Sequence, residues 1–155
     1  MNRRRELLLH PIAVIAIAAL IANDHWFKDA YPGWLTGKLS DAAGLALFPL
    51  LLVVLAGDLA PRSWASIAVA ILITALGFTL VKTCPAATAL YRVGLGALQW
   101  PFLALGDWLH GSGLRGPVAV AAVTDPSDLL ALPFTGLAAV VAWRTGYVRP
   151  GRAPA

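Results

Sequence analysis

Residues 39–56 read LSDAAGLALFPLLLVVLA, a run that is almost entirely apolar after its first few residues. A membrane-spanning α-helix needs about 20 predominantly apolar residues, because it rises about 1.5 Å per residue through a hydrocarbon core about 30 Å thick. The polar residues near the start of the stretch, Ser40 and Asp41, belong to the residue types that begin helices. We therefore predict a transmembrane helix over residues 39–56 that is entered through Ser40 and Asp41.

The composition of the whole chain indicates the same class. Of its 155 residues, 59% are hydrophobic and only 13% are charged, and the mean hydropathy is +0.73. These values lie outside the range of soluble globular domains. The net charge of +4 does not point to nucleic acid, because the arginines lie at the chain ends and in short connectors instead of along one face interleaved with aromatic residues. We predict one transmembrane domain, residues 1–155, with the lipid bilayer as its main partner.

Three further apolar stretches predict additional spans. They cover residues 7–22, 64–81 and 129–143. The span over 64–81 should end just before Pro85, because a proline pushes its predecessor out of helical geometry. Together with residues 39–56 these stretches predict an all-α, polytopic bundle of four transmembrane helices. A cleaved signal peptide is the rival interpretation of residues 7–22.

Residues 86–123 have a different pattern. Their apolar runs are short and interrupted by glycines and prolines, and they carry Trp100 and Trp108. Amphipathic aromatic residues of this kind favour the headgroup region of a bilayer. We predict an irregular, re-entrant or interfacial segment on the outer side of the membrane.

The arginines predict the orientation. They precede the first span at residues 3–5 and follow the last span at Arg144, Arg149 and Arg152, and such basic flanks belong in the cytoplasm. The sequence therefore predicts a multi-pass protein of the plasma (inner) membrane with both termini cytoplasmic and a disordered basic tail over 146–155. The connector 23–41, the end of the third span and residues 125–128 then share the outer side.

Ionisable residues on that outer side form the candidate site. Its catalytic candidates are Asp41, Lys82 and His25, and its binding candidates are Asp24, Lys38, Asp125 and Asp128. Lysines would neutralise an anionic lipid or a phosphate group, while the carboxylates and the imidazole hold a cation or act as acid and base. No motif names a cofactor or a metal for this site, and both catalysis and binding are compatible with these residue types.

Each candidate also has a structural explanation. Asp24 and Lys28 have the i, i+4 spacing of a helical ion pair, and Asp125 is a suitable N-cap. Asp41 could complement the helix dipole in a first turn, and Lys82 could do so at a helix C-terminus. On this interpretation the chain is a non-catalytic accessory or assembly protein whose charges serve caps, pairs and a partner protein.

A third hypothesis is ion- or proton-coupled transport. It requires ionisable residues near the middle of the bilayer, and the centres of the four predicted spans carry none. A transport path would therefore need a homo-oligomer.

Overall fold

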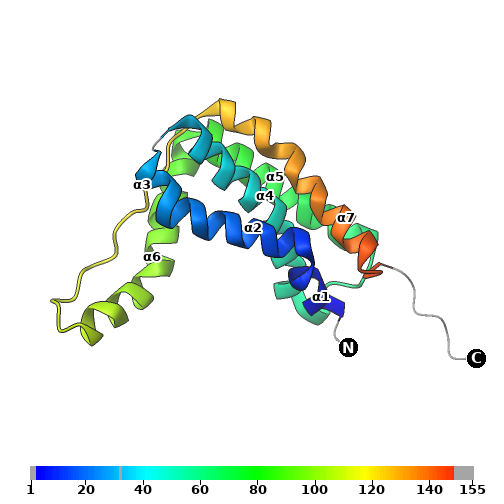
Figure 1. The fold of residues 1–155 in the computed structure, drawn as a ribbon, viewed down its shortest axis with the longest axis horizontal. Helices are drawn as coiled ribbons and strands as arrows, with labels where there is room; N and C mark the ends of the chain where they lie inside the picture. The colour runs from blue at the N-terminus through cyan, green and yellow to red at the C-terminus, as the bar shows by residue number, and fades with distance from the viewer. Residues whose placement is uncertain (1–2, 32, 149–155) are drawn as a thin grey trace, which may run out of the picture. The chain divides into compact units, whose positions relative to one another are not determined.

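A computed structural model describes residues 3–31 and 33–148, which contain helices and no strand (Figure 1). Along the chain the elements are α1 (Arg3–Leu9), α2 (Pro11–Ala22), η1 (Asn23–Phe27), α3 (Lys28–Ala30), α4 (Trp34–Ala56), η2 (Gly57–Leu59), α5 (Trp64–Thr83), α6 (Pro85–Leu109), η3 (Pro126–Gly136) and α7 (Leu137–Arg144). The all-α prediction is confirmed. The elements form two compact units, the first from residues up to 77 and from 128 onward, and the second from residues 78–127.

Among the described residues, three helical stretches are long and apolar enough to cross a membrane. They are Trp34–Leu59, Trp64–Thr83 and Pro126–Arg144. The third combines the 3₁₀ helix η3 with α7. A 3₁₀ helix rises about 2.0 Å per residue, so this combination extends roughly 34 Å although it is the shortest of the three in sequence.

Helix α4 begins earlier than predicted. Its first residue is Trp34, and Gly33 is its N-cap. The Thr36 hydroxyl accepts a hydrogen bond from the Gly33 amide at 3.3 Å and donates to the Gly33 carbonyl at 2.9 Å. The prediction that Ser40 and Asp41 start this helix is therefore wrong, because the hydrogen bonds between Gly33 and Thr36 already cap the helix about two turns before Ser40. Both residues lie in the second turn of α4.

The first apolar stretch is divided at His10. This residue has extended backbone angles, as expected before a proline, and Pro11 opens α2. The prediction of one continuous helix over residues 7–22 is therefore wrong. These residues form the end of α1 followed by α2. After Ala22 the chain stays helical through the π segment η1 and the short helix α3, so the helix that begins at Pro11 reaches Ala30.

The predicted irregular segment is mostly helical. Helix α6 covers Pro85–Leu109, and Cys84 before it is extended, as the proline rule predicts. Glycine costs a helix interior about 1 kcal/mol and proline about 3 kcal/mol relative to alanine, and a helix of 25 residues accommodates Gly94, Gly96 and Pro101. Helix α6 separates its apolar and polar residues onto opposite faces more clearly than α4 or α5 does. Residues 112–125 form no regular element, as predicted for this part of the segment.

In the second unit, the extended segment 112–125 is hydrogen-bonded along α6. The Val120 amide donates a backbone hydrogen bond to the Arg92 carbonyl at 3.1 Å, and the Trp100 indole donates to the Arg115 carbonyl at 2.6 Å. At Gly96 the backbones approach so closely that an added Cβ would lie 2.9 Å from the carbonyl carbon of Val118. We call this segment the strap, because its backbone follows the helix for several turns.

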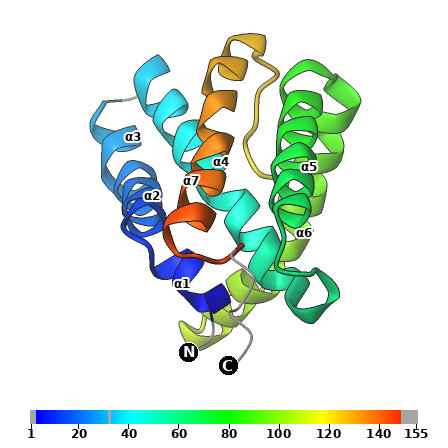
Figure 2. The same cartoon turned by 90° about the vertical axis from the view of Figure 1, so that its right-hand side faces the viewer.

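In the first unit, α4 is the central helix. It packs against α2 through small residues, including Ala16, Ala43 and Ala46, and against α7 through a larger apolar cluster (Figure 2). Small residues allow helices to approach closely, which is the usual packing of helices in membranes.

The larger cluster includes a residue from the predicted disordered tail. Tyr147 is 1% exposed and packs with Leu7, Leu50 and Val141. The prediction of disorder is therefore wrong for the start of the tail, because Tyr147 supplies a large ring that fills the end of the cluster. Residues 149–155, including Arg149 and Arg152, lie outside the described residues.

Candidate functional site

The ion pair between Lys38 and Asp128 joins α4 to η3. Lys38 lies in the second turn of α4 and Asp128 in the first turn of η3, and the lysine ammonium donates a hydrogen bond to the carboxylate. Each side chain is only 12% exposed. The early start of α4 places Lys38 inside the helix, and Pro126 starts η3 so that Asp128 is its third residue. The structure thus brings together two of the predicted site residues from distant parts of the sequence.

An apolar groove lies beside this pair. It has a volume of about 260 Å³ and is open on one side. Its lining consists of Trp34, Leu35, Lys38, Leu39 and Ala42 from α4 and Leu130, Ala131 and Phe134 from η3. The Lys38 ammonium lies 5.4 Å from the centre of the Trp34 ring, within the range of a cation–π interaction. We call this the α4–η3 groove; its wall is hydrocarbon apart from Lys38, whose partner Asp128 is not itself a lining residue.

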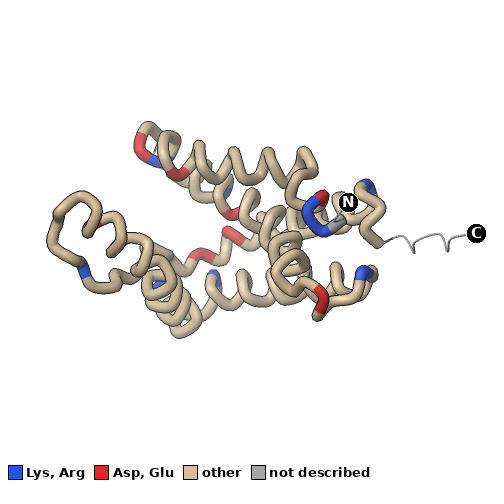
Figure 3. Tube along the Cα trace, turned by 90° about the horizontal axis from the view of Figure 1, so that it is seen from below, with Lys and Arg blue, Asp and Glu red and all other residues tan. Residues whose placement is uncertain are grey.

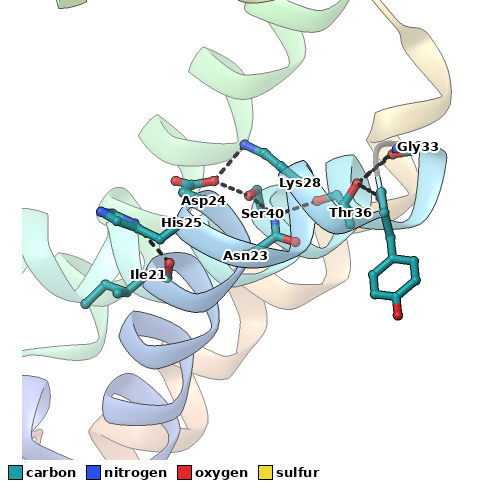
Figure 4. A network of polar contacts seen from close by, with 9 residues as sticks. Ile21, Asn23, Asp24, His25, Lys28, Gly33, Thr36 and Ser40 are labelled. Atoms are coloured by element: carbon teal, nitrogen blue, oxygen red, sulfur yellow. Dashed lines mark hydrogen bonds and ion pairs between the residues drawn. The ribbon is translucent and has the colours of Figure 1, made fainter.

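A second polar cluster connects the end of α2 to α4 (Figure 4). The Asn23 amide group is fully buried and donates to the Thr36 carbonyl at 2.8 Å and to the Ser40 hydroxyl at 2.6 Å. Ser40 in turn donates to Asp24 at 3.1 Å, and Lys28 binds the same carboxylate oxygen at 2.6 Å. This cluster fixes the helix pair, because the two bonds donated by the Asn23 amide nitrogen satisfy a buried donor across the two helices.

The predicted pair of Asp24 and Lys28 is confirmed, and it affects the acidity of Asp24. Partial burial raises the pKa of this carboxyl group, but the hydrogen bond and charge of Lys28, together with the Ser40 hydroxyl, lower it more. The net result is a pKa for Asp24 below its usual value. Asp24 is therefore a stable carboxylate at neutral pH and a poor general acid.

His25 makes a local contact next to this cluster. Its Nδ1 atom lies 3.1 Å from the carbonyl oxygen of Ile21, one turn earlier in the same helix, and the side chain is exposed. Within residues 3–31 and 33–148, no group of three or more His, Cys, Asp or Glu side chains is placed to hold a metal ion.

The remaining candidates lie in three different parts of the chain. Asp41 is partly buried in the second turn of α4, three residues after Lys38, so its predicted place in a first turn is wrong. Asp125 accepts a hydrogen bond from the Ser127 amide at 2.9 Å, which confirms the predicted cap. In the second unit, the Lys82 ammonium lies 5.4 Å from the Phe78 ring centre at the end of α5.

Charged residues lie mainly at helix ends and in the connections, as the coloured trace of Figure 3 shows. The residues predicted for the site were all ionisable, and Asn23 was not among them. Its carboxamide joins the end of α2 to α4. The available signal was an amide residue directly after an apolar run, at a depth where an unpaired polar group is costly.

Comparison with known protein families, curated proteins and solved structures finds no match to this chain. The Lys38–Asp128 pair and the groove beside it are therefore the features from which a function can be inferred. Both belong to the first unit, whose residues also supply the Asn23 cluster.

Proposed function

We propose that this chain is a plasma-membrane protein with four crossings and that it binds the phosphate group of a membrane lipid at the outer end of its bundle. The crossings are the helix that begins at Pro11, then α4, α5, and η3 with α7. The first crossing is supported by the apolar helix α2 and by its helical continuation to Ala30, which carries charged residues suited to the outer boundary of the membrane. The amphipathic helix α6 suits the outer interface, in place of a fifth crossing.

The orientation follows from the basic flanks. Arg4 and Arg5 precede the first crossing and Arg144 ends the last, so an even number of crossings leaves both termini in the cytoplasm. Lys38 and Asp128 then belong to the outer half of the membrane. Trp34 starts α4 at that boundary, where tryptophan side chains are favoured.

A single observation carries the binding proposal: a nearly buried pair of opposite charges lies at an apolar groove. Lys38 supplies an ammonium for a phosphate, and the wall formed by Leu39, Leu130 and Phe134 suits a hydrocarbon chain. The volume of about 260 Å³ is below the roughly 300–1,000 Å³ of a pocket that encloses a whole ligand. The groove therefore takes the part of a lipid next to its headgroup, while the rest of the lipid stays in the bilayer.

Lipid binding to the detergent-solubilised full chain, measured by native mass spectrometry, tests this proposal. The wild type should bind a phospholipid at least tenfold more tightly than a diacylglycerol with the same chains, and the double variant K38M/D128L should lose this preference. The matched control is R115M/D107L, which removes a different ion pair outside the groove. Equal binding by K38M/D128L and the wild type would contradict the proposal.

Accessibility of introduced cysteines tests the topology separately. In a Cys84→Ala background, a membrane-impermeant reagent should label His25→Cys and Asp125→Cys from outside. Arg144→Cys should react only after the membrane is opened. Labelling of positions 25 and 125 from opposite sides would contradict four crossings.

A role as an accessory protein is the second candidate function. It is favoured by the local contacts of Asp24 with Lys28 and of Asp125 with Ser127, since these pairs need no ligand to explain them. On this alternative, variants at Lys38, Asp41 and Lys82 lower the melting temperature by graded amounts, and none changes the lipid preference.

A further inference from the structure

We infer that the lipid bound in the α4–η3 groove is zwitterionic, with an ammonium group next to its phosphate. This inference rests on the proposed function and adds the chemical class of the headgroup. It follows from the charges at the edge of the groove, because Lys38 lines the groove and is paired with the carboxylate of Asp128, which lies next to the lining residues in the chain and is not one of them.

An anionic headgroup fits this arrangement poorly. If its phosphate bound Lys38, it would compete with the carboxylate of Asp128 for the same ammonium and place two negative charges side by side. Both side chains are only 12% exposed, so water and salt screen this repulsion weakly. An anionic lipid would thus bind at the expense of the existing ion pair.

A cationic amphiphile has the opposite difficulty. Its ammonium would bind Asp128 and leave Lys38 next to a second positive charge. A zwitterion avoids both problems, because its phosphate approaches Lys38 while its ammonium approaches Asp128. Four alternating charges then lie together, and each buried group keeps an opposite charge beside it.

Two neighbouring side chains favour an ammonium further. Asp41 follows Lys38 by three residues on the same helix, a spacing that places side chains on one face, and it adds a second carboxylate near the pair. Trp34 lines the groove, and the Lys38 ammonium lies 5.4 Å from the centre of its ring. The face of this ring attracts a cation, whether the cation belongs to Lys38 or to a lipid headgroup.

The test compares lipids with identical acyl chains and different headgroups. The full-length wild-type protein is titrated with phosphatidylethanolamine, phosphatidylglycerol and diacylglycerol, and bound lipid is counted by native mass spectrometry. Phosphatidylethanolamine should bind at least threefold more tightly than phosphatidylglycerol. Equal or tighter binding of phosphatidylglycerol would overturn the inference and leave the proposed function standing, whereas no preference for either phospholipid over diacylglycerol would overturn both.

A charge variant tests the same point independently. Asp128→Asn keeps the size of the side chain and removes its charge, so the preference should move at least threefold toward phosphatidylglycerol. Asp29→Asn is the matched control, because it removes the same charge from an exposed side chain on a different helix, α3. An unchanged preference in folded Asp128→Asn would overturn the inference, and the wild-type comparison decides it if this variant does not fold.

Discussion

The ammonium of Lys38 is hydrogen-bonded to the carboxylate of Asp128, 90 positions further along the chain, and each side chain is 12% exposed. This contact joins the first turns of α4 to η3. The Asn23 cluster binds the same part of α4, through Thr36 and Ser40. A pair this buried has two separate consequences, one for stability and one for binding.

The stability consequence is a strong asymmetry between single and double variants. Asp128→Ala should lower the free energy of unfolding by about 3–5 kcal/mol, because it removes the carboxylate that binds the buried Lys38 ammonium. The double variant K38M/D128L should lie within about 1–2 kcal/mol of the wild type, since apolar side chains of similar volume remove both charges. Thermal melting in detergent measures both, and a double variant as unstable as Asp128→Ala would contradict this explanation.

The pair of Asp24 and Lys28 predicts a small loss of stability in acid. The pKa of Asp24 is lowered in the folded protein, so this carboxylate stabilises the fold above its unfolded pKa of about 3.9. That contribution is lost as the pH falls through the lower pKa of the folded state. It should amount to less than about 1 kcal/mol, because both side chains are nearly half exposed.

Melting temperatures from pH 7 to pH 3 check this effect. The difference between the wild type and Asp24→Asn should be largest at neutral pH and should shrink toward pH 3. A difference that stays constant over this range would show that ionisation of Asp24 makes no contribution.

Local features of the fold could be predicted from the sequence. Pro85 fixed the extended conformation of Cys84, the spacing of Asp24 and Lys28 indicated their ion pair, and Asp125 was recognised as a cap. Each of these depends on residues within four positions of one another, so the chain needs no tertiary information to specify them.

The start of α4 could not be predicted in the same way. Gly33 with Thr36 and Ser40 with Asp41 are both suitable beginnings, and local preference does not decide between them. In the folded chain, Asn23 donates to the Thr36 carbonyl and to the Ser40 hydroxyl, which ties both positions to the preceding helix. The Lys38–Asp128 pair was unpredictable for a related reason, because it requires two helices to pack first.

Tyr147 yields a prediction about the core. Its hydroxyl is buried without a hydrogen-bond partner within the described residues, and its ring is 1% exposed. Tyr147→Phe should therefore leave the free energy of unfolding unchanged or raise it, since it removes a buried polar group that gains nothing from the fold. Tyr147→Ala should lower it by about 3–5 kcal/mol, as large-to-small changes of buried aromatic residues do. Chemical denaturation in detergent compares the two, and a clear loss in Tyr147→Phe would contradict the buried, unpaired hydroxyl.

Gly96 yields the prediction for the second unit. A Cβ at this position would overlap the carbonyl group of Val118, so Gly96→Ala should push the strap away from α6. Gly94→Ala is a matched control on the same helix, because nothing lies within 4 Å of its added Cβ and alanine favours the helix by about 1 kcal/mol. Hydrogen exchange at the Val120 amide, which is hydrogen-bonded to the Arg92 carbonyl at 3.1 Å, reports on the contact directly.

Exchange at this amide should be at least tenfold faster in Gly96→Ala than in the wild type and unchanged in Gly94→Ala, because only the first change separates the two backbones. Equal exchange in both variants would mean that the strap does not depend on the close approach at Gly96.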